Sequence, residues 1–149
     1  MRQRAAARAD LETIVAMFAD DQLGKTREDA SLPLNSRYTD AFAALDGDPN
    51  QYLLVGESDG IIVAYLQISF MQHLSRLGSS RGQVESVRVR SDLRGQGIGK
   101  LLMQESIRLC RERGCSLGFS FEDHTPRHEP DGCGATRSLE EALPRSSET

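Results

Sequence analysis

The chain has 149 residues, 38% hydrophobic and 27% charged, with a formal net charge of −4 at pH 7. This length suits one domain with a substantial core, and the acidic balance argues against a dedicated nucleic-acid binder, whose domain is usually basic. The longest apolar run, residues 61–66, is too short to cross a membrane, and Arg8, Asp10 and Glu12 interrupt any signal-peptide core near the N-terminus.

Two helices are predicted before the first strand. Apolar side chains recur at helical spacing over residues 11–18, with Asp10 as the N-cap and Gly24 as the stop. Residues 25–35 are polar and indicate a loop, and a second, shorter helix is predicted over residues 36–45.

Three consecutive strands are predicted at residues 51–55, 61–69 and 83–89. Asp59-Gly60 is a hairpin signal between the first two strands, and residues 70–82 are expected to form a loop. The strands are followed by a turn and a further helix, so the order of elements predicts a mixed α/β (α+β) sheet.

The turn at residues 94–99, Arg-Gly-Gln-Gly-Ile-Gly, is the most informative segment of the chain. It joins the strand at 83–89 to a helix expected over residues 98–113, so free backbone N–H groups and the helix dipole would favour an anion there. Glycines let the backbone approach that anion, and Arg94 and Lys100 add positive charge. The spacing matches neither a Walker A loop nor the dinucleotide pattern, and an acidic chain with this one basic spot suits a small anionic cofactor.

A strand is expected after the helix, because a three-stranded sheet needs its edge covered. Residues 117–121 are the only candidate after Gly114. The sequence therefore predicts a fourth strand there.

The strand and turn within residues 83–103 resemble motif A of the GCN5-related N-acetyltransferases (GNAT), an Arg/Gln-x-x-Gly-x-Gly/Ala pattern after a strand. The upstream layout is also similar, over roughly residues 8–117. The resemblance implies a GNAT fold and an enzyme that moves acetyl from acetyl-CoA to a primary amine of a small molecule or protein, by direct attack in a ternary complex. Its partners would be acetyl-CoA and the amine acceptor, with no nucleic acid, membrane or metal.

The resemblance also implies roles for the residues of the motif. The pyrophosphate of acetyl-CoA would be held by the turn residues Arg94, Gly95, Gln96, Gly97, Ile98, Gly99 and Lys100. Val87 and Val89 would offer backbone groups to the pantetheine arm and the thioester, and one of their N–H groups would stabilise the oxyanion.

Glu85 is the candidate catalytic residue, because family members often carry a general base at this position. Strict strand alternation places Glu85 on one face with Val87 and Val89. The other face then carries Val84, Ser86 and Arg88. The alternative for Glu85 is a carboxylate that bonds a loop or only binds a cationic substrate, and the sequence weighs the two evenly. Tyr65 could line the acceptor site, but a core tyrosine is the favoured interpretation.

The resemblance stops after Leu117. Residues 118–149 lose periodicity and contain few aliphatic side chains, which indicates a divergent, poorly ordered tail such as a reading-frame shift would produce. Family members often use a tyrosine in this region to protonate the departing thiolate, and here no tyrosine follows Tyr65. The activity is therefore expected to be impaired, the open sheet edge invites a homodimer, and the alternative is a non-catalytic acyl-CoA-binding remnant or a protein-interaction module.

The cysteines and histidines indicate neither a disulfide framework nor a metal site. Cys110, Cys115 and Cys133 are an odd number without framework spacing, so we expect free thiols in a reducing cytoplasm. His124, His128 and Cys133 match no zinc spacing and lack a fourth ligand.

Overall fold

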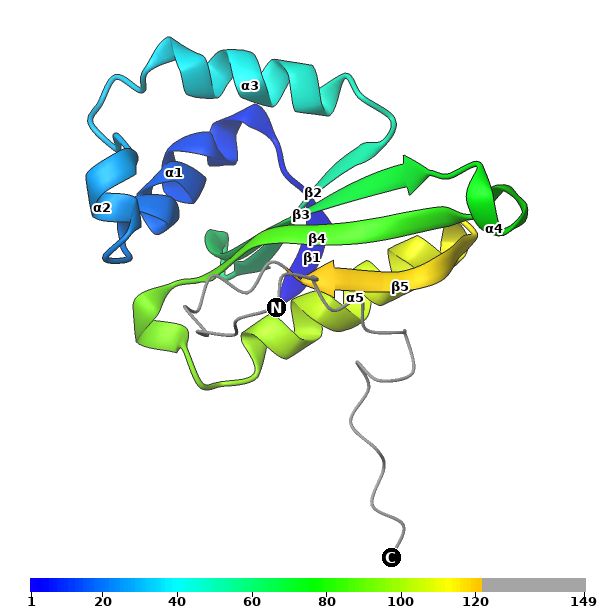
Figure 1. The fold of residues 1–149 in the computed structure, drawn as a ribbon. Coiled ribbons are helices and arrows are strands. Elements are labelled where there is room, and N and C mark those ends of the chain that lie inside the picture. Colours follow the sequence, from blue (N-terminus) through cyan, green and yellow to red (C-terminus); the bar gives the residue numbers. More distant parts are fainter. Residues whose placement is uncertain (122–149) are drawn as a thin grey trace, which may run out of the picture.

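The computed structural model describes residues 1–121, which form a five-stranded sheet with helices on both faces (Figure 1). The strands lie in the order β1 (Arg2–Ala5), β2 (Gln51–Ser58), β3 (Ile61–Gln72), β4 (Ser80–Val89), β5 (Cys115–Phe121). All neighbours are antiparallel except β4 and β5, which are parallel. This confirms the mixed α/β sheet and the additional strand after the long helix.

The helices divide between the two faces of the sheet. They are α1 (Leu11–Ala19), which follows the 3-10 turn η1 (Arg8–Asp10), then α2 (Gly24–Arg27), α3 (Ser36–Asp46), α4 (Ser75–Gly78), and α5 (Ile98–Glu112), which follows the 3-10 turn η2 (Ser91–Leu93). Side chains of α1 and α3 pack with one set of sheet residues, and α5 packs with the other. The predicted helices over residues 11–18, 36–45 and 98–113 are confirmed, and α2 shows that the predicted loop at 25–35 begins with a helical turn.

Each face of the sheet has its own apolar core. Under α1 and α3 lie Leu53, Val55, Ile62 and Tyr65 of β2 and β3. Under α5 lie Leu54, Leu66, Ile68 and Val84 of β2, β3 and β4. Because neighbouring positions such as Leu53 and Leu54 go to opposite faces, the strands read as near-continuous apolar runs.

The connection from β3 to β4 differs from the prediction. The predicted loop at residues 70–82 is instead strand at both ends, because β3 continues to Gln72 and β4 begins at Ser80. The turn between them is closed by Arg76 and Leu77 in the left-handed region, with φ of 54° and 58°. Residues 80–82, the extension of β4, carry no apolar side chain, so no strand pattern marks the segment there.

Other turns and edges show what local signals can reveal. Asp59 and Gly60 both have positive φ, 52° and 77°, as a two-residue type I′ hairpin requires, so that prediction is confirmed. Strand β1 was not predicted, because its four residues alternate arginine with an uncharged residue and include no large apolar side chain. It pairs with β2 at the sheet edge, with Arg4 opposite Val55.

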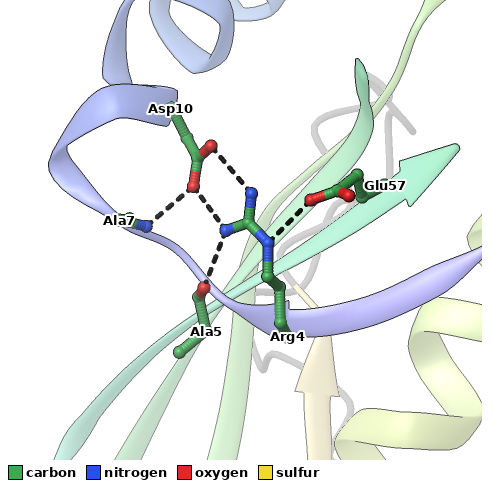
Figure 2. A network of polar contacts seen from close by, with 5 residues as sticks. All are labelled: Arg4, Ala5, Ala7, Asp10 and Glu57. Atoms are coloured by element: carbon green, nitrogen blue, oxygen red, sulfur yellow. Dashed lines mark hydrogen bonds and ion pairs between the residues drawn. The ribbon is translucent and has the colours of Figure 1, made fainter. Parts of the chain in front are cut away.

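Arg4 joins three segments in a polar network (Figure 2). Its Nη1 and Nη2 donate to Oδ2 and Oδ1 of Asp10 at 2.7 and 3.0 Å, and its Nε donates to Glu57 at 2.8 Å. Asp10 also accepts from the N–H of Ala7 at 2.7 Å. Asp10 is the N-cap residue of α1, as predicted, but its side chain makes no capping hydrogen bond to that helix, because its carboxylate bonds Arg4 and the N–H of Ala7.

The predicted tail, residues 118–149, begins inside β5, which runs to Phe121. The rest of that segment, with His124, His128 and Cys133, lies outside the described residues. None of the helices within residues 1–121 has the length and apolar character needed to span a membrane.

Candidate functional site

A β-bulge interrupts β4 at Ser86. Gln67 of β3 stands opposite Glu85, and Tyr65 stands opposite Arg88, so two residues of β4 oppose the single residue Leu66. Ser86 takes the left-handed conformation, with φ of 54°. A bulge of this kind adds one residue to a strand and resets which side chains face which way.

The bulge overturns the predicted alternation along β4. Val87 and Val89 pack against the α5 core together with Val84, whereas Glu85 hydrogen-bonds Gln83 on the opposite face. The expectation that Glu85 shares a face with Val87 and Val89 is therefore wrong. The extra residue at the bulge moves the two valines to the other side of the sheet.

Beyond Val84, β4 presents a backbone edge that no strand covers within residues 1–121, since pairing with β5 ends at Val84 opposite Phe121. The N–H of Arg90 donates to Val63 of β3 at 2.9 Å. Backbone groups of successive residues point to opposite edges of a strand, so those of Val87 and Val89 point away from β3. An extended ligand that carries amides can pair with such an edge as an added strand would.

Two guanidinium groups contact the carbonyl oxygens of this edge. Arg88 Nη1 donates to the oxygen of Val87 at 2.9 Å, and Arg94 Nε donates to the oxygen of Val89 at 3.2 Å. The edge therefore runs directly into the turn that precedes α5.

The turn at residues 94–100 has the geometry of an anion cradle. Gly95 and Gly97 lie in the left-handed region, with φ of 79° and 82°, and Gly97 is the N-cap of α5, without a side chain that caps the helix. A Cβ added at either glycine would meet no atom within 4 Å, so the space before these glycines is open. Arg94 is half exposed, at 52%, and Lys100 is exposed, so both leave cationic groups for an anion.

The turn after α1 supplies two carboxylates that the sequence-based prediction missed. Asp21 Oδ2 lies 3.2 Å from Arg88 Nη2, and Asp20 Oδ2 lies 3.9 Å from Arg94 Nη2. The N–H of Gly24 bonds Asp21 and, with Arg88 nearby, lowers the pKa of that carboxyl. Acidic residues after a helix are usually solvent-exposed. Nothing in the neighbouring sequence therefore predicts that Asp20 and Asp21 pair with arginines far away in the chain.

Tyr65 lies in the core beside the bulge, with 4% of its surface exposed. Its ring meets Phe18 of α1 edge to face, at 5.3 Å between centroids and 75° between planes. Burial, with a contribution from the charge of Glu85, raises the pKa of the phenol. The interpretation of Tyr65 as a core residue is confirmed, and its hydroxyl stays protonated at neutral pH.

The described residues show no alternative centre for metal chemistry. No three histidine, cysteine or acidic side chains within residues 1–121 form a group that could hold a metal ion. Cys110 and Cys115 are buried free thiols. Burial raises the pKa of the Cys110 thiol to about 12, so it is protonated at neutral pH.

Comparison with known proteins identifies a family and its fold. The sequence model of the acetyltransferase (GNAT) family matches residues 14–128. A transcriptional regulator from Bacillus halodurans C-125 is 40% identical, with a TM-score of 0.79 and 84% of each chain covered. A putative acetyltransferase from Agrobacterium tumefaciens str. C58 is 20% identical, with a TM-score of 0.71 and 85% of each chain covered. A predicted acetyltransferase with acetyl-CoA from Clostridium acetobutylicum is 16% identical, with a TM-score of 0.60, covering 76% of this chain and 75% of that one.

Proposed function

The chain belongs to the GNAT family of acetyltransferases, and on that premise we propose that it transfers acetyl from acetyl-CoA to a primary amine in a ternary complex. One observation carries the proposal. The open edge of β4 at Val87 and Val89 leads into the uncapped N-terminus of α5, while Glu85 lies on the opposite face of the same strand. In this arrangement the open edge of β4 and the N-terminus of α5 would bind an anionic, amide-bearing cofactor. The face of β4 that carries Glu85 would receive an amine.

The residues of the turn fit the cofactor. We propose that the backbone N–H groups of residues 95–100 hold the pyrophosphate, with Arg94 and Lys100 adding charge-assisted contacts. The left-handed glycines leave the cradle open, where a Cβ would fill it. Val87 and Val89 would pair through their backbone groups with the amide-bearing arm, and the bound cofactor supplies the thioester that is attacked.

Glu85 is proposed as the general base. It would remove a proton from the ammonium group of the acceptor, directly or through water, and leave a neutral nitrogen whose lone pair attacks the thioester carbonyl. The N–H of Val87 or Val89 would stabilise the oxyanion. When the C–S bond breaks, the thiolate leaves with the electron pair and takes up the second proton, which the attacking nitrogen loses, and the products are an amide and free CoA.

A second candidate is favoured by the relative that is 40% identical, since that protein is described as a transcriptional regulator. In this alternative the chain binds an acyl-CoA without turnover and acts through a protein partner. The turn at residues 94–100 and the open edge of β4 would bind the acyl-CoA in the same way. Glu85 would then have only a structural role, through its hydrogen bond with Gln83.

A proposal about the compartment rests on the thiols. Cys110 and Cys115 are free, which suits a reducing environment, so we propose the cytoplasm as the site of action.

The two candidates are separated by measuring binding and turnover together. Calorimetry measures the affinity of the protein for CoA. Release of free thiol from acetyl-CoA in the presence of a panel of primary amines measures acetyl transfer. Acetylation of at least one amine above the rate of the amine-free reaction supports the enzyme. Normal CoA affinity without amine-dependent thiol release, across small-molecule and peptide amines, would support the binding protein instead.

A further inference from the structure

A row of polar side chains crosses three strands on the face of the sheet that carries Glu85. This carboxamide row consists of Gln51 of β2, Gln67 and Ser69 of β3, and Gln83 and Glu85 of β4. The register pairs Gln51 with Ser69, Ser69 with Gln83, and Gln67 with Glu85. The five side chains are therefore contiguous although they span 35 positions of the chain, from 51 to 85.

Hydrogen bonds hold the row in place but use only part of its capacity. Gln51 Oε1 accepts from Gln67 Nε2 and from Ser69 Oγ, both at 2.9 Å, and Gln83 Nε2 donates to Glu85 Oε1 at 2.5 Å. Among the side chains of residues 1–115, none hydrogen-bonds the amide nitrogen of Gln51, the amide oxygens of Gln67 and Gln83, or the second carboxylate oxygen of Glu85. These unused donors and acceptors remain for a ligand.

The row lies beside the apolar patch on which α1 and α3 pack. Leu53, Val55 and Tyr65 on that patch are buried, whereas every residue of the carboxamide row is half-buried. In Figure 1, β3 and β4 run on past α1 and α2 toward α4. Half-buried carboxamides with unused donors and acceptors are costly to cover with an apolar molecule, so this surface favours a polar one.

One cation extends the row. Arg81 lies four residues before Glu85 on β4, roughly 13 Å along the strand, and opposite Met71, whose sulfur is 3.9 Å from Arg81 Nη2. The Nε of Arg81 is buried and has no hydrogen-bond partner among the described residues. A guanidinium with open donors is suited to a carboxylate or phosphate.

We propose that this face binds the acceptor, and that the acceptor is a small hydroxylated primary amine that also carries an anionic group. The inference rests on the proposed function, since it names the substrate of that reaction. The amine lies at Glu85 beside the bulge, the hydroxyl groups exchange hydrogen bonds with Gln67 and Gln83, and the anionic group pairs with Arg81.

Other amines fit the row poorly. The stem of a lysine side chain or an aliphatic diamine consists of methylenes, which cannot bond the carboxamides that flank Glu85. Covering those groups without bonding them would cost affinity. A hydroxyl group both donates and accepts, so it matches the mixed amide nitrogens and oxygens of the row.

The test measures amine binding separately from turnover. Four probes are titrated into the protein saturated with CoA, and each is then assayed for thiol release from acetyl-CoA. The probes are glucosamine 6-phosphate, 2-amino-2-deoxygluconate, glucosamine and 1,5-diaminopentane. We expect at least one anionic probe to bind about tenfold or more tighter than glucosamine, and glucosamine to bind tighter than the diamine. The better of the two anionic probes identifies the anionic group as phosphate or carboxylate.

Two substitutions test the contacts themselves. Arg81→Met should weaken the preferred anionic probe by roughly 10- to 100-fold and leave glucosamine within about threefold. Gln67→Leu should weaken the hydroxylated probes but not the diamine. Arg111→Met and Gln104→Leu, on the exposed surface of α5, are the matched controls and should change neither. If Arg81→Met does not fold, Arg81→Lys keeps the charge without the planar donors and should show a smaller loss of the same probe.

Three outcomes would overturn the inference. They are equal affinity for anionic and uncharged hydroxylated amines, tighter binding of the diamine, and no binding of any probe to protein that binds CoA. In each case acetylation of a different amine would leave the proposed function standing. Conversely, selective binding of an anionic probe without thiol release would support the acceptor site while contradicting the proposed transfer.

Discussion

Arg88, just after the bulge of β4, pairs with Asp21, in the turn that follows α1, at 3.2 Å. The guanidinium also lies over the ring of Phe18, 5.8 Å from its centroid. Through these two contacts the bulged segment of the sheet is tied to the end of α1. The helix side of the candidate acceptor face is thus anchored to the strand that would hold the cofactor.

Arg88→Met should loosen this tie. The substitution keeps most of the side-chain length but removes the ion pair and the cation–π contact, and it leaves Asp21 partly buried without its cation. We expect the free energy of unfolding to fall by about 1–3 kcal/mol in urea denaturation. Arg111→Met on the surface of α5 is the control. Equal stability of the two variants would show that the pairing with Asp21 is incidental.

Gly97→Val should block the cradle at the N-terminus of α5. The side chain would project into the open space before the helix, where we place the pyrophosphate. We expect affinity for CoA, measured by calorimetry, to fall by about tenfold or more.

Gly60→Val is the matched control for that prediction. Gly60 lies in the β2–β3 hairpin with φ of 77°, close to the 82° of Gly97, and a Cβ there also meets open space. Both variants therefore suffer similar backbone strain. If Gly97→Val and Gly60→Val bind CoA equally well, the pyrophosphate does not lie at this turn.

Asp10→Asn should weaken the network around Arg4. The hydrogen bond from Arg4 is the largest cause that lowers the pKa of Asp10 from its ordinary 3.8. A carboxyl with a lowered folded-state pKa stabilises the fold above its unfolded pKa, and this stabilisation is lost as pH falls through the folded value. The variant should therefore lose about 1–3 kcal/mol of unfolding free energy at pH 7, and the difference should shrink below about pH 4.

Urea denaturation at pH 7 and at pH 2 measures this difference in unfolding free energy. The control is Asp92→Asn, because Asp92 pairs with Arg90 on an exposed loop and should change stability little. A difference between wild type and Asp10→Asn that persisted undiminished at pH 2 would contradict the assigned role of the carboxylate.

The parts of the fold that the sequence predicted are those with local causes. Glycine spacing indicates the turn at 94–99, and apolar residues at 3.6-residue intervals indicate the helix after it. The hairpin at Asp59-Gly60 is equally local, because both positions need positive φ. The turn at which we propose that the pyrophosphate binds could therefore be predicted from a short stretch of sequence.

The rest depends on register between distant strands. Nothing in the run from Val84 to Val89 marks Ser86 as a bulge, yet that bulge places Val87 and Val89 on the face opposite Glu85. The carboxamide row is invisible for the same reason, because Gln51, Gln67 and Gln83 become neighbours only after β2, β3 and β4 pair. Strict alternation fails wherever a strand gains a residue.

Glu85→Gln is the decisive substitution for the chemistry. Glutamine keeps an oxygen that can accept the hydrogen bond from Gln83 but cannot take up a proton, so the local structure should survive while the base is lost. We expect kcat to fall by on the order of 10² or more with CoA affinity unchanged. Glu12→Gln, on the exposed face of α1, is the matched control and should keep the wild-type rate. Should Glu85→Gln retain the wild-type kcat, the carboxylate only shapes the face on which the acceptor lies, and the proton must leave the amine by another route.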